Sequence, residues 1–176
     1  MSVSKLLLTR LNAQKIKYDV IEHRKVYTAY DLAATLKTDL SCIAKALVLK
    51  AHSVIAVAIL PAHRRLDMKK IKRVLKVNNV FIVSEKEMMR LISMKPGALN
   101  VLGRFPKETV IMIDKEMVKP KKVIVGVGSF TDSLVCTPKV LVALLPQAQI
   151  VDIHESTVVK MKKPQKQKVR KTKKSK

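Results

Sequence analysis

The most strand-like stretch of the chain reads IAKALVLK at residues 43–50. Because side chains alternate between the two faces of a strand, Lys45 shares its face with the apolar Ile43 and Leu47. Burying an ammonium among such neighbours is costly unless the group is paired, loses its proton or borders a pocket that holds an anion. Lys45 is therefore either a functional cation at the wall of a cleft or a residue near a sheet edge that reaches water along its stem.

A second apolar stretch, VIAVAIL at residues 54–60, follows so closely that a hairpin turning at 51–53 is predicted. Elsewhere helical spacing and strand-like alternation succeed each other along a single domain. Thr28, Asp67 and Ser84 stand where helix caps are expected. We expect helices at 2–16, 29–36, 68–75, 85–92 and from Pro138, and further strands at 18–23, 80–83 (compact and buried), 109–114, 123–127, 133–137 and near 150–153.

Lysine and arginine dominate the charge, with 36 of them against 13 acidic residues and a formal net charge of +23. Ten of these basic residues lie in residues 160–176, which contain no acidic residue, so residues 1–159 keep 26 against 13. We therefore expect a folded domain at 1–159 and a disordered basic tail at 160–176. A polyanionic partner suits both parts, and nucleic acid is favoured over a merely solubilising tail or an acidic membrane surface.

Simple counts disfavour several classes of site and location. No apolar run approaches the ~20 residues that cross a bilayer, and the N-terminus does not resemble a secretory signal, so we expect no membrane partner and a cytoplasmic protein. Cys42 and Cys136 lack the spacing of a zinc site, so neither a structural metal nor a cofactor is expected. An aromatic content of 3% argues against a base-stacking surface. We expect the four scattered histidines at the surface or in loops: His23, His52, His63 and His154.

The chain has only four glycines, and they fall in two loops, Gly97 with Gly103 and Gly126 with Gly128. Backbone amides at such loops can bind a carbonyl or phosphate oxygen and stabilise a developing oxyanion. The commoner use of glycine is a tight turn that requires a positive φ, and both readings stay open.

These pieces together resemble the YbaK/ProX type of aminoacyl-tRNA editing domain, which occurs free-standing and within bacterial prolyl-tRNA synthetases. The resemblance covers about residues 20 to 145. No single motif decides it, but several weak motifs follow in the right order and at the right spacing: His23 with Thr28-Ala29, residues 43–50, residues 57–67, Lys95-Pro96-Gly97-Ala98, Ile113-Asp114 and Gly128-Ser129.

The resemblance implies an α/β (α+β) fold, a single domain with a mixed central β-sheet surrounded by helices. It also implies a cleft that binds the 3′ end of a mischarged tRNA and hydrolyses its aminoacyl ester without a metal or a covalent enzyme intermediate. A synthetase is a candidate partner beside tRNA, and a small amino acid such as cysteine or alanine, on tRNA-Pro for example, is the expected substrate. The implied roles are catalysis by Lys45, Gly97 and Ala98, substrate binding by Thr28, Tyr30, Ala46, Gly128 and Ser129, and tRNA binding by Arg64, Arg65, Lys69 and Lys70.

Two departures and two rival functions remain. Asn100 stands where many relatives have a proline, which affects the pocket shape, and the basic tail lies outside the family core. One rival is a non-catalytic RNA-binding protein on the same scaffold, in which Lys45 only grips phosphate. The other is a small-molecule hydrolase, a function that would not explain the high positive charge of the chain.

Truncation after Val159 tests the tail. Because each phosphate contact releases counterions, removing ten basic residues should weaken tRNA binding and flatten its dependence on salt. Binding is measured by filter retention at several salt concentrations, with the full chain as the reference. Unchanged affinity at moderate salt would show that the tail supplies none of it.

Overall fold

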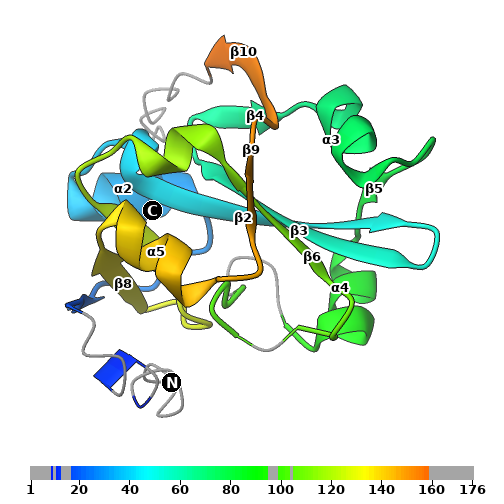
Figure 1. Cartoon of the computed structure of the whole chain (residues 1–176). Coiled ribbons are helices and arrows are strands. Elements are labelled where there is room, and N and C mark those ends of the chain that lie inside the picture. The colour runs from blue at the N-terminus through cyan, green and yellow to red at the C-terminus, as the bar shows by residue number, and fades with distance from the viewer. Residues whose placement is uncertain (1–8, 10, 13–16, 95–98, 104, 159–176) are drawn as a thin grey trace, which may run out of the picture.

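The computed structural model describes residues 9, 11–12, 17–94, 99–103 and 105–158. Its centre is a mixed eight-stranded sheet in the order β1-β8-β7-β2-β3-β6-β9, with β5 also paired to β2 (Figure 1). The pairs β7–β2, β3–β6 and β6–β9 are parallel and the others antiparallel. The predicted fold class is thus confirmed. The strands are β1 Asp19–Glu22, β2 Ile43–Ala51, β3 Val54–Pro61, β5 Phe81–Ile82, β6 Val110–Asp114, β7 Val123–Gly126, β8 Asp132–Cys136 and β9 Gln149–Val151.

A second, two-stranded sheet pairs β4 (Arg64–Leu66) with β10 (His154–Val158). Neither strand was predicted from the sequence. Four helices and two short 3₁₀ turns complete the described fold: α2 Ala29–Leu36, α3 Met68–Leu75, α4 Glu85–Ile92, α5 Pro138–Leu144, η1 Leu40–Cys42 and η2 Lys115–Val118.

The hairpin β2–β3 forms the middle of the sheet, as predicted. Its register runs without interruption from Ala44 opposite Pro61 to Ala51 opposite Val54, and His52 in the turn has a φ of 52°. Six of the eight residues of β3 are buried, because β3 lies between two neighbouring strands and is covered on both faces.

Local capping interactions start the helices at the predicted places. The Thr28 hydroxyl accepts a hydrogen bond from the Asp31 amide at 3.1 Å, and the Ser84 hydroxyl accepts one from the Glu87 amide at 3.3 Å. The Asp67 carboxylate accepts hydrogen bonds from the backbone amides of Lys69 and Lys70 in the first turn of α3. These contacts satisfy amides that have no partner within the helix.

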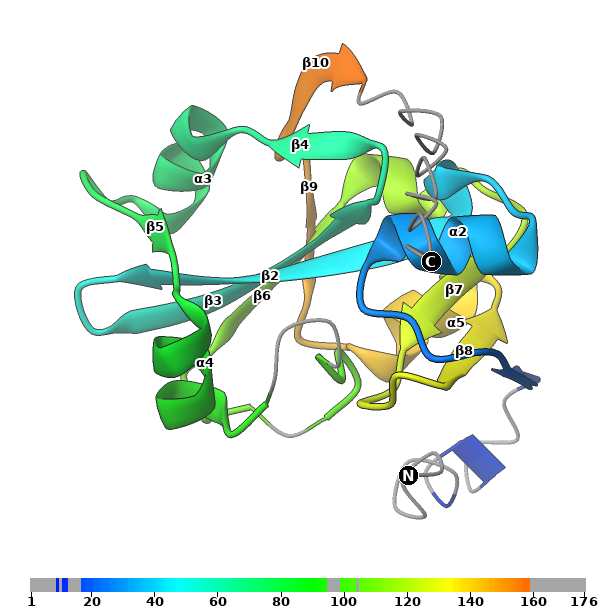
Figure 2. The same cartoon turned by 180° about the vertical axis from the view of Figure 1, so that it is seen from behind.

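The two faces of the sheet carry different cores. Helices α4 and α5 cover one face, whereas α2 and α3 cover the other; Figure 1 shows α5 in front of the sheet and Figure 2 shows α2 in front. On the second face the core divides in two: Ile43 of β2 belongs to the cluster under α2, and Leu49 to the cluster under α3. Lys45 lies on the same face of β2 between them.

The structure corrects one predicted element. The segment 80–83 is not a buried strand: β5 contains only Phe81 and Ile82, which are 48% and 51% exposed. Only Val80 and Val83, which flank β5, are buried. The strand itself is short because it pairs only with Leu49 and Lys50, near the hairpin turn at the end of β2. The predicted helix at 2–16 lies largely, and the tail at 160–176 entirely, outside the described residues.

Cys136 is a core residue, and burial raises the pKa of its thiol to about 11. The helices of the described part are all too short or too polar to cross a lipid bilayer.

Asp114, at the end of β6, is fully buried and fastens three segments together. Its carboxylate accepts hydrogen bonds from the backbone amides of Ile153 at 2.9 Å and Glu116 at 2.8 Å, and it contacts Nδ1 of His154 at 2.9 Å. His154 is 7% exposed and lies in a strand, so the expectation of a surface or loop histidine was wrong for this residue.

Asp114→Ala should lower the free energy of unfolding by about 3 kcal/mol, because it leaves buried donors without an acceptor. Urea unfolding followed by circular dichroism measures the change. Glu108→Ala, which removes an exposed carboxylate, is the control and should unfold like the parent. A loss below about 1 kcal/mol for Asp114→Ala would contradict this account of the buried network.

Candidate active site

The site begins with an opening in the central sheet. Strand β7 pairs with β2 only at residues 43 and 44, and β5 pairs with it only at residues 49 and 50. Between these pairings, residues 45–47 have no neighbouring strand on this edge among the described residues. A cavity of about 470 Å³ lies at the opening and is lined from several elements: His23, residues 26–30, Leu32, residues 43–48, Ile82, Val83, Glu85, Met88, Leu99, Val101, Gly126, Ser129 and Ser133.

Lys45 lines this cavity and is only partly buried. Its ammonium donates to the carbonyl oxygen of Arg64 at 2.7 Å and reaches that of Ala62 at 3.5 Å. Burial lowers the pKa of Lys45, and the nearby positive charge of Arg65 lowers it further. Both partners are neutral, and no carboxylate in the described part of the chain forms an ion pair with Lys45. Its positive charge therefore remains available to an anionic ligand.

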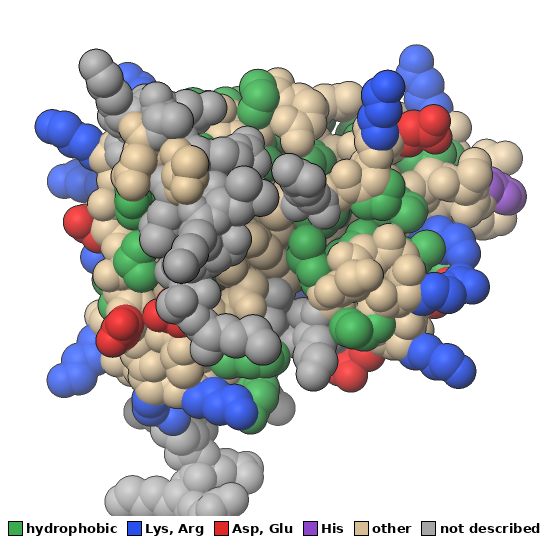
Figure 3. Space-filling view, turned by 90° about the horizontal axis from the view of Figure 1, so that it is seen from below, with side chains coloured by type: hydrophobic (Ala, Val, Ile, Leu, Met, Phe, Trp, Pro, Cys, Tyr) green, Lys and Arg blue, Asp and Glu red, His purple; other side chains and the backbone are tan. Residues whose placement is uncertain are grey.

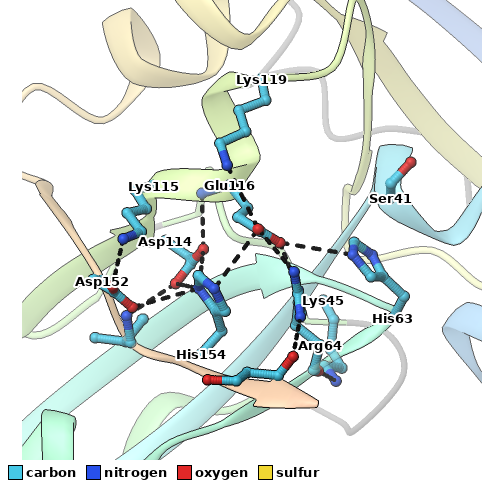
Figure 4. Close-up of polar contacts among 12 residues, drawn as sticks. Ser41, Lys45, His63, Arg64, Asp114, Lys115, Glu116, Lys119, Asp152 and His154 are labelled. Carbon is cyan, nitrogen blue, oxygen red and sulfur yellow. Dashed lines mark hydrogen bonds and ion pairs between the residues drawn. The ribbon is translucent and has the colours of Figure 1, made fainter. Parts of the chain in front are cut away.

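The turn that holds Lys45 is itself fixed by a charged pair. Arg64 donates to both carboxylate oxygens of Glu116, from Nε at 2.6 Å and from Nη2 at 2.9 Å (Figure 4). Its Nη1 also donates to the carbonyl oxygen of Ser156 at 2.8 Å. Such a bidentate pair sets the orientation of the guanidinium and with it the backbone of residue 64.

In the lining of the same cavity, the fold brings together a histidine and a serine that are 110 residues apart in the sequence. His23 Nδ1 lies 2.9 Å from the carbonyl oxygen of Arg24, which can only accept, so Nδ1 carries the hydrogen. In the neutral ring Nε2 is then the acceptor for the Ser133 hydroxyl, 3.0 Å away. This pair gives the cavity a basic nitrogen whose orientation is fixed.

The loop after β7 supplies a further polar group. Ser129 donates from its hydroxyl to Asp132 at 2.5 Å, and this hydrogen bond is the largest cause that lowers the pKa of Asp132. Gly128 has a φ of 87°, so its role is the tight turn. A Cβ on Gly126 would lie 3.1 Å from the carbonyl oxygen of Leu99, so glycine there lets the 99–103 loop approach the sheet.

The predicted site residues fall into three groups. Lys45, Thr28, Tyr30, Ala46 and Ser129 line the cavity together, whereas Gly128 does not. Gly97 and Ala98 lie outside the described residues, and their proposed role stays a prediction; the neighbouring Leu99 and Val101 do line the cavity.

The residues predicted to bind tRNA differ in their availability. Arg65 and Lys69 are exposed. Arg64 is paired with Glu116, and Lys70 donates to Asp152 at 2.6 Å. Arg64 and Lys70 therefore hold the fold together in the free protein.

A second cavity, of about 670 Å³, lies on the other side of the turn that holds Lys45. This cavity is more open to solvent than the first, and residues 45–47 do not line it, so we do not place the catalytic chemistry there. Its charged lining is mainly cationic, and Lys121 and Lys122 are exposed. The lining residues are Ser41, Cys42, His63, Arg64, Glu116 and residues 119–122.

One cluster has the residue types of a metal site: Asp114, Asp152 and His154 offer ligand atoms within 4.8 Å of one another. Its oxygens are already engaged, because Lys70 and Lys115 bind the Asp152 carboxylate and two backbone amides bind that of Asp114. Figure 4 shows the Lys115–Asp152 pair beside Asp114 and His154. This arrangement is that of a structural network of hydrogen bonds and ion pairs and not that of a metal-ion site.

The chain is similar to known proteins over most of its described length. The model of the aminoacyl-tRNA editing domain family matches residues 23–144. A proline–tRNA ligase of Staphylococcus saprophyticus is 29% identical over 106 residues, which are 60% of this chain but 18% of the ligase. The chain therefore spans only a small part of that relative.

Solved structures share the fold. A protein described as hypothetical has a TM-score of 0.76 at 20% identity, covering 85% of this chain and 99% of its own. A candidate trans-editing enzyme for prolyl-tRNA synthetase has a TM-score of 0.73 at 21% identity, covering 88% of this chain and 100% of its own.

Arg65→Ala should raise the pKa of Lys45, because it removes a positive charge that disfavours the ammonium. The pKa is read from the pH titration of the ¹³Cε signal of labelled lysine, assigned with Lys45→Arg. Arg73→Ala removes an exposed charge from α3 and serves as the control. A Lys45 pKa that stays the same or falls in Arg65→Ala would show that this repulsion is absent.

Proposed function

The chain belongs to the aminoacyl-tRNA editing domain family, and we propose that it hydrolyses the ester that joins an amino acid to the 3′ end of a tRNA. The observation that carries the proposal is the position of Lys45, a cation that has no carboxylate partner among the described residues and lies at a cavity in the opened sheet. The terminal nucleotide of a charged tRNA brings both a phosphate for this ammonium and an ester to be cleaved.

The cavity favours a small amino acid. Apolar side chains of moderate size form much of its wall, among them Val26, Val48 and Met88. With the nucleotide in place, about 470 Å³ leaves little room for a large side chain. Alanine and cysteine are the first candidates, and the similarity to a proline–tRNA ligase makes tRNA-Pro the first tRNA to test. A prolyl-tRNA synthetase is the first candidate partner.

In the proposed reaction, water attacks the carbonyl carbon of the ester. The bond between that carbon and the ribose oxygen breaks, the ribose oxygen gains a proton, and a free amino acid and an uncharged tRNA leave. The ammonium of Lys45 binds the phosphate of the terminal nucleotide and fixes the ester in the cavity. Donors that face the carbonyl oxygen stabilise its negative charge as it develops, a role we assign to the amides near Gly97 and Ala98.

The proton of the attacking water needs an acceptor. His23 lines the cavity and offers Nε2, whose lone pair accepts a hydrogen bond from the Ser133 hydroxyl, and the Arg24 carbonyl keeps the ring in this tautomer. Ser133 occupies this position in the free protein and can pass the hydrogen bond on to a water molecule. We therefore place His23 and Ser133 on the side of the ester from which water attacks.

Affinity for the rest of the tRNA follows from the basic surface. Figure 3 shows lysine and arginine side chains projecting around the rim of one face, with acidic side chains scattered among them. Arg65, Lys69, Lys121 and Lys122 are exposed candidates for phosphate contacts. Such contacts position an RNA without reading its sequence.

The rival function is RNA binding without catalysis. The same Lys45 contact to phosphate would support it. The two functions differ in one respect, since only the enzyme releases an amino acid from charged tRNA. The basic surface alone favours neither.

Lys45→Ala should reduce deacylation by about 10- to 150-fold, which corresponds to the loss of a hydrogen bond from a charged group, worth about 1.5–3 kcal/mol. The assay measures amino acid released from tRNA charged with alanine, cysteine, serine, threonine or proline. The parent chain should release one or two of these selectively.

Lys50→Ala is the matched control, since Lys50 lies on the same strand but pairs with Glu87 and does not line the cavity. Circular dichroism and thermal unfolding verify that both variants fold. If the parent binds tRNA but releases no amino acid, the chain is a binding protein and the enzyme proposal fails.

A further inference from the structure

Three of the six aromatic residues of this chain lie at or next to the proposed active site. The sequence contains three tyrosines, three phenylalanines and no tryptophan. Tyr27 and Tyr30 line the cavity, and Phe130 contacts the Tyr27 ring. Tyr27 is 59% exposed, more than any other large apolar or aromatic side chain of the described residues. A low aromatic content predicts no base-stacking surface, but the position of these rings at the cavity makes base stacking possible there.

Tyr27 is held firmly even though its ring faces solvent. The Val26 amide donates to the carbonyl oxygen of Phe130 at 3.0 Å, and the His23 amide donates to that of Thr131 at 2.8 Å. Val26 is buried beneath the segment. The Phe130 ring lies 5.2 Å from the Tyr27 ring, centre to centre, and is tilted by 51°. The exposed ring therefore has a fixed base and needs little ordering to bind a ligand.

A cation accompanies the ring. The Lys25 ammonium lies 5.3 Å from the centre of the Tyr27 ring, and the side chain of Lys25 is exposed. Residues 25 and 27 lie on either side of the inward-pointing Val26, so both project outward from the same extended segment. A planar ring beside an exposed ammonium matches a nucleotide, which offers a base to stack and a phosphate to pair.

We propose that Tyr27 and Lys25 form a nucleotide subsite at the mouth of the cavity, where Tyr27 stacks on a base of the single-stranded 3′ end of RNA. This proposal rests on the proposed function and specifies how the substrate is gripped. Unpaired RNA ends are commonly recognised by stacking on aromatic side chains. The stacked nucleotide precedes the terminal one, because the ester of the terminal nucleotide has to reach the cavity.

A hydrophobic protein segment is the other ligand that an exposed tyrosine could bind. The lysine beside the ring favours the nucleotide, because an apolar segment would strip water from the ammonium without offering it a counter-charge. The position of Tyr27 at the rim of the cavity that Lys45 also lines favours the nucleotide as well. Lys25 and Lys45 then contact successive phosphates of one RNA strand.

The test compares two substrates that differ in the nucleotides before the ester. One is a full tRNA charged with the amino acid that the parent chain releases, and the other, called the aminoacyl-adenosine below, is the same amino acid esterified to adenosine 5′-phosphate, which keeps the phosphate for Lys45. Base stacking is worth about 1–3 kcal/mol, so Tyr27→Ala should raise KM for the charged tRNA by about 5- to 150-fold. Hydrolysis of the aminoacyl-adenosine should stay unchanged, because that substrate lacks the stacked nucleotide.

Three further variants control the comparison. Tyr27→Phe keeps the ring and should behave like the parent, whereas Lys25→Ala should weaken tRNA binding and lower its salt dependence. Phe81→Ala removes a 48% exposed aromatic ring outside the cavity and should have no effect. Thermal unfolding shows whether each variant folds.

Equal losses on both substrates in Tyr27→Ala would mean that Tyr27 only shapes the cavity, and equal losses in Tyr27→Ala and Phe81→Ala would mean unspecific contact. Either result overturns the subsite. If the parent chain hydrolyses neither substrate, the proposed function fails. The subsite is then tested by fluorescence anisotropy with a labelled RNA oligonucleotide ending in CCA. Weaker binding in Tyr27→Ala but not Tyr27→Phe supports the subsite, and unchanged binding refutes it.

Discussion

The ammonium of Lys45 has to be accommodated on a strand face that otherwise belongs to the hydrophobic core, and much of the structure near the site follows from this. The core on that face divides into a cluster under α2 and a cluster under α3, and the lysine occupies the boundary. Two backbone carbonyls of the following turn accept its hydrogen bonds. The Arg64–Glu116 ion pair, whose side chains are mostly buried, fixes that turn and so places two neutral oxygens. Acceptors without charge satisfy the lysine and leave its positive charge uncompensated.

The sheet provides space for a ligand by leaving one strand incompletely paired. Strands β5 and β7 share the same edge of β2 and stop short of each other, which leaves an opening in the middle of a strand. The glycine at position 126 and the turn at Gly128 end β7 early enough to leave this opening. The cavity is thus a property of strand lengths, and the side chains that line it come from segments that are distant in the sequence.

Local physics explains which parts of this structure could be predicted from the sequence. Side-chain alternation located the hairpin and singled out Lys45, and the capping residues Thr28, Asp67 and Ser84 fixed three helix starts. The prediction of a buried strand at 80–83 was wrong, because the composition of this segment shows that it is apolar but not how few residues of β2 are free to pair with it. Contacts across 40 or 110 residues, such as His154 with Asp114 and His23 with Ser133, leave no local signal. Nor does the sequence show that Arg64 and Lys70 have internal partners.

The internal network has a consequence for how quickly tRNA is released. Asp114, Glu116, Asp132 and Asp152 are engaged by partners within the fold, and the chain as a whole carries a formal net charge of +23, so its surface is cationic. Such a surface attracts correctly and incorrectly charged tRNAs alike. Under the proposed function, discrimination among these tRNAs falls to the cavity, and we expect departure of the uncharged product to limit turnover more than the cleavage itself.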